Sequence, residues 1–293
     1  MKNRRQIGDL IKEIRENSGV SSRNLYEGLM TRTNLYRIEN NKHGSNYETV
    51  IQLVERLSMN IGEFEYLRRG YHDYPLNEFM DELRKIRVSI NTEALKELEW
   101  KINQQIDDEG SEILVDLSHM IGGYIILQET NNLSLAREKF LKIWNRLKKK
   151  DSLYYNDVLL LSNILFMFDE DIILLILARL NKYYQIYDNF GDTKRLKRNT
   201  FYNYCTYLRL QERYLEVEEV IKIVYRLATE EKDLLMILES QYCLCEVNWI
   251  KGEKIKTHNK VKKIIEALEM GQQALIAADI KKDWYQLTGK LVE

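Results

Sequence analysis

Helical spacing of the apolar residues, interrupted by a single proline, is the feature that most limits the folds open to this chain of 293 residues. Beyond residue 76, apolar side chains recur every three or four positions, and no stretch keeps the strict alternation of a half-buried strand. Pro75 is the one proline and there are 13 glycines, so little in the sequence would stop a long helix. The sequence therefore predicts an all-α protein, and its length predicts about two domains.

The charges are divided unevenly along the chain. Residues 1–70 carry 12 Lys and Arg against 9 Asp and Glu, whereas residues 71–293 carry 32 against 36. A net charge of +3 on residues 1–70 and of −4 on residues 71–293 fits a small N-terminal domain that binds a polyanion. The start is polar and basic, and the longest apolar run, Ile172–Ala178, is too short to cross a membrane. We therefore expect a cytoplasmic protein without a membrane partner.

The sequence lacks the signatures of an enzyme or a metal protein. Cys205, Cys243 and Cys245 are odd in number and form no C-x-x-C pairs, which predicts buried free thiols rather than disulfides or a zinc site. The four histidines are scattered, and no H-E-x-x-H, G-x-S-x-G or phosphate-loop pattern occurs. We expect no catalytic residues, no metal and no cofactor.

The first 67 residues predict five short helices. Ile7, Leu10, Ile11 and Ile14 have the spacing of one buried helical face, and Gly19 would end that helix. Later helix starts are predicted from capping residues. These are Ser21 or Ser22 before a helix carrying Leu25 and Leu29, Thr31 about three residues beyond its end, Ser45 with Glu48, and Asn60 with Glu63.

The helix that begins after Thr31 has an unusual polar surface. Leu35 and Ile38 alone have the spacing to anchor it inward. Its other side chains are suited to base edges in the DNA major groove, where Arg bridges guanine and Asn bridges adenine. The predicted base contacts are Arg32, Thr33, Asn34, Tyr36 and Arg37. The predicted phosphate contacts are Arg15, Arg23, Lys42 and His43.

Residues 19–40, GVSSRNLYEGLMTRTNLYRIEN, resemble the helix-turn-helix of Cro and phage repressors, with its Ser/Leu second helix and its Leu-x-x-Ile-Glu third helix. That family usually has Gln, which holds a phosphate, where this chain has Ser22. The alternative is a small helical module whose third helix is merely solvated. We predict a DNA-binding domain at residues 1–67 and a linker at residues 68–76, where Gly, Pro and charges cluster.

Residues 77–293 contain a degenerate internal repeat. Tyr124–Glu129 is echoed by Tyr207–Glu212, each followed by a polar turn and a second amphipathic helix. The first of these second helices has Ala136 and Phe140 at the A-x-x-x-F spacing of a tetratricopeptide repeat, and the next has Val217 and Ile221. First helices that end near residues 128, 169, 211 and 251 give a period of about 40 residues, which predicts an α-solenoid of paired helices.

Amide side chains recur at helical spacing on the predicted first helices. Amides offer both a donor and an acceptor, as the backbone of an extended peptide requires. The residues concerned are Asn156, Asn163, Asn199, Asn203, Thr206, Gln241 and Asn248, with Tyr202, Tyr207 and Trp249 as apolar neighbours. From these we take Asn163, Asn199, Tyr202, Asn203, Tyr207 and Asn248 as candidate peptide-binding residues. Solvated surface asparagines are the alternative interpretation.

Two further segments, Leu159–Asp169 and Asn199–Leu208, resemble the repeat domain of Rgg/MutR-type regulators, which are related to the PlcR and PrgX regulators. The resemblance implies a transcriptional regulator that forms a homodimer through its C-terminal helices, binds an operator with two half-sites, and docks a short quorum-sensing peptide on its concave face, with Asn203 as the first backbone ligand. Two alternatives stay open: a ligand-independent repressor of plasmid or phage type, and a helical-repeat scaffold for a protein partner.

Overall fold

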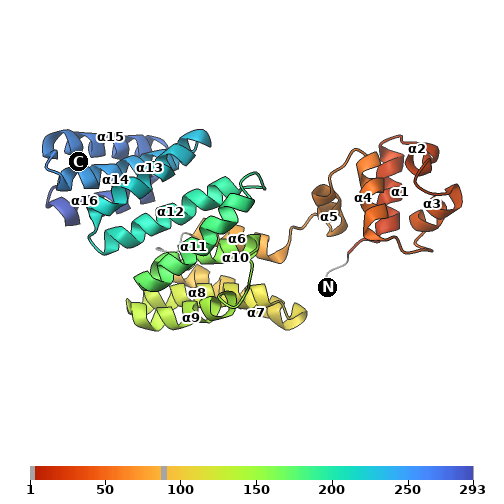
Figure 1. The fold of residues 1–293 in the computed structure, drawn as a ribbon, viewed down its shortest axis with the longest axis horizontal. Helices are drawn as coiled ribbons and strands as arrows, with labels where there is room; N and C mark the ends of the chain where they lie inside the picture. The colour runs from red at the N-terminus through yellow and green to blue at the C-terminus, as the bar shows by residue number, and fades with distance from the viewer. Residues whose placement is uncertain (1–3, 87–90, 293) are drawn as a thin grey trace. The chain divides into compact units, whose positions relative to one another are not determined.

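A computed structural model describes residues 4–86 and 91–292, without the side chains of residues 108 and 109. These residues form sixteen α-helices and one 3-10 helix, and none of them lies in a strand (Figure 1). The predicted all-α fold is confirmed. The chain divides into two compact units, residues 1–115 and residues 116–293, which are described separately below.

The first unit begins with the five short helices expected from the sequence. They are α1 (Ile7–Asn17), α2 (Ser22–Tyr26), α3 (Arg32–Glu39), α4 (Tyr47–Arg56) and α5 (Ile61–Arg68). They enclose one hydrophobic core to which each helix contributes, including Leu10, Leu25, Leu35, Leu53 and Phe64, all at most 1% exposed. Five helices this short cannot be stable alone, so this shared core holds them in place.

The helix caps agree with the sequence at three positions and differ at one. The side chains of Ser21, Thr31 and Asn60 each accept a hydrogen bond from the backbone three residues further on. The capping box predicted at Ser45 is wrong, because Asn46 caps α4 by accepting from the Thr49 amide at 2.8 Å. The amide side chain of Asn46 stands one residue closer to the first turn and takes the role of the Ser45 hydroxyl.

The turn between α2 and α3 is longer than expected. The sequence placed Leu29 within the second helix, but α2 ends at Tyr26 and α3 starts at Arg32. Gly28 in this turn has φ +77°, a conformation that favours glycine. Leu29 still packs against the core from the turn.

Two longer helices follow in the first unit, α6 (Pro75–Ile86) and α7 (Thr92–Glu109), and they pack against each other. Pro75 stands at the first position of α6, where a missing amide hydrogen costs nothing. The segment at residues 68–76, predicted as a linker, contains left-handed backbone at Gly70 and Tyr71. It lies inside the first unit, and the limits 1–67, 68–76 and 77–293 stay a prediction.

The second unit is a stack of helix pairs. Its helices are α8 (Glu112–Thr130), α9 (Leu133–Leu147), α10 (Tyr155–Ile164) with η1 (Leu165–Met167), α11 (Glu170–Ile186), α12 (Thr193–Leu210), α13 (Tyr214–Glu230), α14 (Leu234–Ile250), α15 (Lys254–Met270) and α16 (Ala274–Thr288). The first helices of the pairs end at residues 130, 167, 210 and 250, close to the ends expected from the repeat. Figure 1 shows α12 to α16 running back and forth beside one another.

The small and large residues of the repeat fit together as its spacing predicts. Ala136, Phe140, Val217 and Ile221 have no exposed surface. A Cβ atom on Gly123 of α8 would lie 2.6 Å from the ring of Phe140, so the glycine permits the close approach of α8 and α9. Buried contacts of this kind hold the two helices of a pair together, and stacking on the next pair covers the rest of their apolar surface.

Candidate functional site

The exposed face of α3 contains every residue predicted to contact bases. Thr31 caps the helix through a 3.2 Å hydrogen bond from the Asn34 amide. Leu35 and Ile38 are 1% and 5% exposed and anchor the helix to the core. The five predicted base contacts are all exposed, namely Arg32, Thr33, Asn34, Tyr36 and Arg37. The helix therefore presents an exposed, mostly polar face from Arg32 to Arg37.

Three of the four predicted phosphate contacts are also exposed. Arg23 forms an ion pair with Glu27 one turn further along. The ammonium of Lys42 lies 5.6 Å from the centre of the Tyr36 ring, and His43 follows it in the loop after α3. Ion pairs this exposed are weak, so Arg23 can exchange its partner at little cost.

Arg15 has a different environment from the one expected. Its Nε atom lies 2.6 Å from Oε1 of Glu39, and its side chain is only 13% exposed. Arg15 also donates to the carbonyl oxygen of Val20. The guanidinium thus ties α1 to the end of α3 and to the start of the α2 segment, which is a structural role.

The sequence did not single out Asn41, although it fixes the loop after α3. Its Oδ1 accepts from the Gly8 amide at 3.1 Å, and its Nδ2 donates to Oδ1 of Asp9 at 2.6 Å. Its backbone is left-handed, with φ +54°. An asparagine two residues beyond the end of the helix was a signal for this turn, since Asn tolerates left-handed backbone better than most residues.

The candidate peptide-binding amides lie on the first helices, and three of them already make side-chain hydrogen bonds within the protein, Asn199 by accepting from Arg198 at 3.4 Å. Nδ2 of Asn203 on α12 donates to the carbonyl oxygen of Ser162 on α10 at 2.7 Å. Nδ2 of Asn163 donates to the carbonyl oxygen of Leu159 in its own helix. Asn199 and Asn248 are half-buried. Asn203 therefore joins neighbouring first helices, a contact that spacing alone could not indicate.

The two candidate tyrosines are also packed within the second unit. The Tyr202 hydroxyl lies 3.4 Å from Oε1 of Glu239 and donates to it. Tyr207 is 8% exposed and stacks on Tyr204, with ring centres 6.2 Å apart. The six candidates are thus spread over α10, α12 and α14.

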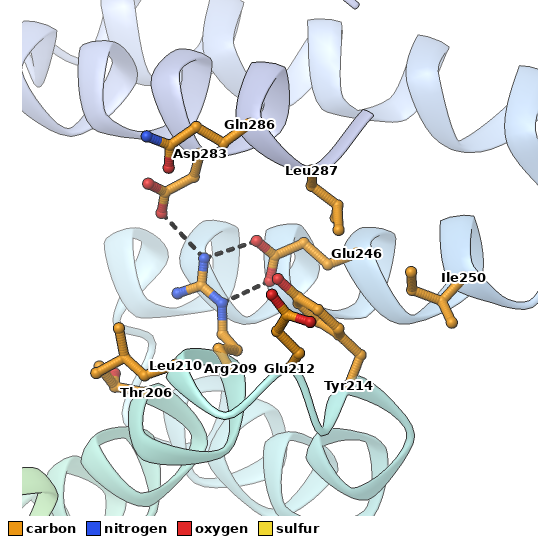
Figure 2. Close-up of a pocket in the computed structure, with 10 residues that line it drawn as sticks. All are labelled: Thr206, Arg209, Leu210, Glu212, Tyr214, Glu246, Ile250, Asp283, Gln286 and Leu287. Carbon is orange, nitrogen blue, oxygen red and sulfur yellow. Dashed lines mark hydrogen bonds and ion pairs between the residues drawn. The ribbon is translucent and has the colours of Figure 1, made fainter. Parts of the chain in front are cut away.

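A pocket of about 640 Å³ opens between the C-terminal ends of α12, α14 and α16 (Figure 2). Its walls are formed by Thr206, Arg209, Leu210, Glu212, Tyr214, Glu246, Ile250, Asp283, Gln286 and Leu287. Nearly all of these residues were not predicted as site residues, because they come from segments up to 81 positions apart and share no motif. Thr206 alone was singled out.

An ion-pair cluster of Arg209, Glu246 and Asp283 lies at the base of this pocket. Arg209 places Nε 2.6 Å from Oε2 of Glu246, and its Nη2 donates to Oε1 of Glu246 at 2.6 Å and to Oδ2 of Asp283 at 3.0 Å. Burial raises the pKa of the Glu246 carboxyl, and the adjacent Arg209 acts in the opposite direction. The cluster joins α12, α14 and α16 (Figure 2).

The three cysteines are free and buried, as the sequence predicted. Burial raises the pKa of the Cys243 thiol to about 12 and that of Cys245 to about 11, which makes both unreactive. Within residues 4–86 and 91–292, no group of His, Cys, Asp and Glu side chains could hold a metal ion. Nor does any helix in that part of the chain have the length and apolar character to cross a bilayer.

A helix-turn-helix unit with an exposed third helix, followed by stacked helix pairs, defines a class of transcriptional regulators with a helical-repeat domain. Residues 125–282, just over half of the chain, match the profile of the C-terminal domain of the HTH-type transcriptional regulator Rgg. The chain belongs to the Rgg family of transcriptional regulators, which are not enzymes. The family resemblance stated from the sequence is confirmed.

Solved structures share the fold over nearly the whole chain. A putative transcriptional regulator from Listeria monocytogenes matches with a TM-score of 0.78 at 18% identity, over 97% of each chain. The SHP pheromone receptor Rgg2 of Streptococcus dysgalactiae matches at 0.68 and 14% identity, over 96% of this chain and all of that one. Bacillus thuringiensis PlcR, solved with the peptide PapR7 and DNA, matches at 0.66 and 16%, over 97% and 99%. No curated protein matches the chain.

Proposed function

We propose that this regulator binds operator DNA through α3 and that a short peptide bound to its repeat unit controls this binding. The observation that carries the proposal is the polar face of α3, on which five side chains suited to base edges are exposed while Leu35 and Ile38 hold the helix. The base contacts we propose are Arg32, Thr33, Asn34, Tyr36 and Arg37. Because operator DNA lies in the cytoplasm, we propose that the protein acts there.

Arg23, Lys42 and His43 are the proposed phosphate contacts, since all three are exposed beside α3 in the chain. Arg15 is left out, because its ion pair with the nearly buried Glu39 would have to break before it could reach DNA. Breaking a pair of this kind leaves a carboxylate poorly solvated and costs more than one phosphate contact returns.

The test of the DNA-binding face is a gel-shift series on a promoter fragment that the protein occupies in vivo. Arg32→Ala and Arg37→Ala should each weaken operator binding by about tenfold or more, because a bidentate contact to a base is worth about 1–3 kcal/mol. Arg84→Ala is the matched control, since it removes the same charge from an exposed side chain on α6. Unchanged binding of both α3 variants would overturn the proposed interface.

Salt dependence separates the two kinds of contact. Lys42→Ala should reduce the slope of log K against log salt by about 1 for each protomer bound, because each protomer neutralises one phosphate fewer, whereas Asn34→Ala should lower affinity without changing the slope. We propose that the protein acts as a homodimer on two half-sites, so each substitution counts twice per operator. Equal slopes for the Lys42 and Asn34 variants would contradict the assignment.

The proposal of peptide control is supported by similarity to solved receptors and by the polar first helices. PlcR was solved with PapR7 and DNA, and PrgX was solved in complexes with cCF10 and iCF10. In this chain Asn163, Asn199, Tyr202, Asn203, Tyr207 and Asn248 are the proposed peptide contacts. An amide keeps a carbonyl acceptor when its nitrogen is used, so Asn203 can hold α10 and still receive a peptide N–H.

Peptide control is tested by mapping the DNA sites that the protein occupies with and without peptide-containing culture supernatant. If the dimer has one arrangement that binds DNA and another that does not, a peptide that binds them unequally should change occupancy, by no more than the ratio of its two affinities. A bound peptide that changes neither operator affinity nor transcription would favour a ligand-independent repressor.

A further inference from the structure

The pocket between α12, α14 and α16 has an unbalanced set of charges. Its walls contain three carboxylates, from Glu212, Glu246 and Asp283, and one cation, Arg209. One guanidinium compensates one carboxylate, and the geometry assigns it to Glu246, which is 2% exposed and meets Arg209 through two nitrogens. Asp283 and Glu212 are therefore left as net negative charge at the mouth of the pocket.

Asp283 is held much less firmly than Glu246. It shares Nη2 of Arg209 at 3.0 Å, and its side chain is 44% exposed. Figure 2 shows its carboxylate on α16 directed across the pocket toward Arg209 on α12. An incoming cation could thus take Asp283 from Arg209 without exposing the buried pair of Arg209 and Glu246.

Three buried polar atoms of this region lack a partner in hydrogen-bond geometry within the described residues. They are Nε of Arg209 and Oε2 of Glu246, which form an ion pair at 2.6 Å, and the hydroxyl of Tyr242, which is 3% exposed. Buried polar atoms in native proteins nearly always have a partner. Glu246 lines the pocket, so a ligand with several N–H donors would add a donor to the one that Arg209 already provides.

We propose that this pocket binds a positively charged group of the controlling peptide, either its N-terminal ammonium or a Lys or Arg side chain, between Glu212, Asp283 and Glu246. The inference rests on the proposed peptide control and adds the chemical class of the ligand. The bound cation competes with Arg209 for Asp283 and so loosens the ion pair between α12 and α16 in this pocket. A pocket of about 640 Å³ is large enough for a charged side chain with its neighbours.

The test uses the full-length protein and two synthetic pools of random heptapeptides without cysteine, one with free and one with acetylated N-termini. Peptides retained by the protein are identified by mass spectrometry. We expect enrichment of Lys and Arg, or a requirement for the free N-terminus. A retained peptide is then resynthesised and titrated against variants of the protein.

Asp283→Asn and Glu212→Gln should each weaken binding of that peptide by about tenfold, which corresponds to roughly 1.4 kcal/mol. Both side chains are partly or fully exposed, so the variants should fold. Glu219→Gln is the matched control, because it removes a carboxylate that is 84% exposed on α13 and does not line the pocket. Asp283→Lys should shift the selection toward acidic peptides.

The outcomes separate the two proposals. Retained peptides that are neutral or acidic, or that bind the Asp283 and Glu212 variants as they bind the wild type, would overturn the cation pocket and leave peptide control standing. Retention of no peptide from either pool would overturn peptide control, and the cation pocket with it.

Discussion

Gly8 lies where the first turn of α1 passes the end of α3. A Cβ atom there would stand 1.9 Å from the carbonyl oxygen of Ile38 and 2.6 Å from Oδ1 of Asn41. The Gly8 amide also donates to that same Oδ1. A single missing methyl group therefore sets the distance between α1 and the helix proposed to read DNA.

Gly8→Ala should lower the free energy of unfolding by about 2 kcal/mol or more, because backbone atoms must move to admit the methyl group. The measurement is the urea midpoint followed by circular dichroism. Gly44→Ala is the control, since a Cβ at Gly44 meets nothing within 4 Å and its backbone does not require glycine. Equal midpoints for the two variants would show that the α1–α3 contact is looser than described.

His119 on α8 gives the repeat unit a dependence on pH. Burial lowers the pKa of its imidazole from 6.5, Lys142 and Lys139 lower it further, and Asp116 raises it. Its Nδ1 is buried without a hydrogen bond in the described residues. The folded state therefore prefers the neutral ring.

The contribution of His119 to stability is thus present above pH 6.5 and is lost as the pH falls below that value. His119→Gln should show a smaller drop in melting temperature between pH 7 and pH 5.5 than the wild type. His72→Gln, at a side chain 60% exposed, is the control. An identical drop in all three proteins would exclude this role.

At the scale of elements, buried charge links one helix to the turn between the next two. Arg198 on α12 is 3% exposed and pairs with Glu231 and, at 3.0 Å from Nη2, with Asp233. Asp233 also caps α14 by accepting from the Met236 amide. One guanidinium thus fixes the place where α14 starts.

Arg198→Ala should lower the free energy of unfolding by about 2 kcal/mol, below the value for a fully buried pair because both partners can regain water. Arg195→Ala is the control, since its ion pair with Asp192 is exposed and should contribute less than about 1 kcal/mol. A loss for Arg198→Ala no larger than for Arg195→Ala, measured by urea unfolding, would show that the buried pair does not fix α14.

Helix starts were predictable where the cap lies next to a clear apolar stripe. Thr31 and Asn60 are examples, and each cap depends on atoms only three residues apart. Ser45 and Asn46 are both good caps in adjacent positions, so local chemistry could not choose between them. Packing of Val50, Leu53 and Val54 against the core sets the rotation of α4 and selects Asn46.

For the repeat unit as a whole, the last helix closes the stack. Trp284 of α16 is fully buried, lies 5.1 Å from the Trp249 ring centre to centre, and donates through Nε1 to Nδ1 of His258. It thereby joins α14, α15 and α16 in one cluster. Stacked pairs are stable only when their end is covered, and α16 provides that cover.

Trp284→Ala should lower the free energy of unfolding by about 4 kcal/mol through the cavity it leaves. Trp100→Ala is the matched control, because Trp100 is 63% exposed. Urea unfolding followed by circular dichroism compares the two. A similar small change in both would show that α16 does not stabilise the stack.

The sequence by itself determined the helical fold, the period of the repeat and the exposed face of α3, since these depend on residues within about four positions of one another or on a regular repeat. Tertiary structure decided which charges meet. Arg15 and Glu39 are 24 positions apart, Asn203 and Ser162 are 41, and Arg209 and Asp283 are 74. Such contacts depend on how whole helices stack, and no local pattern contains that information.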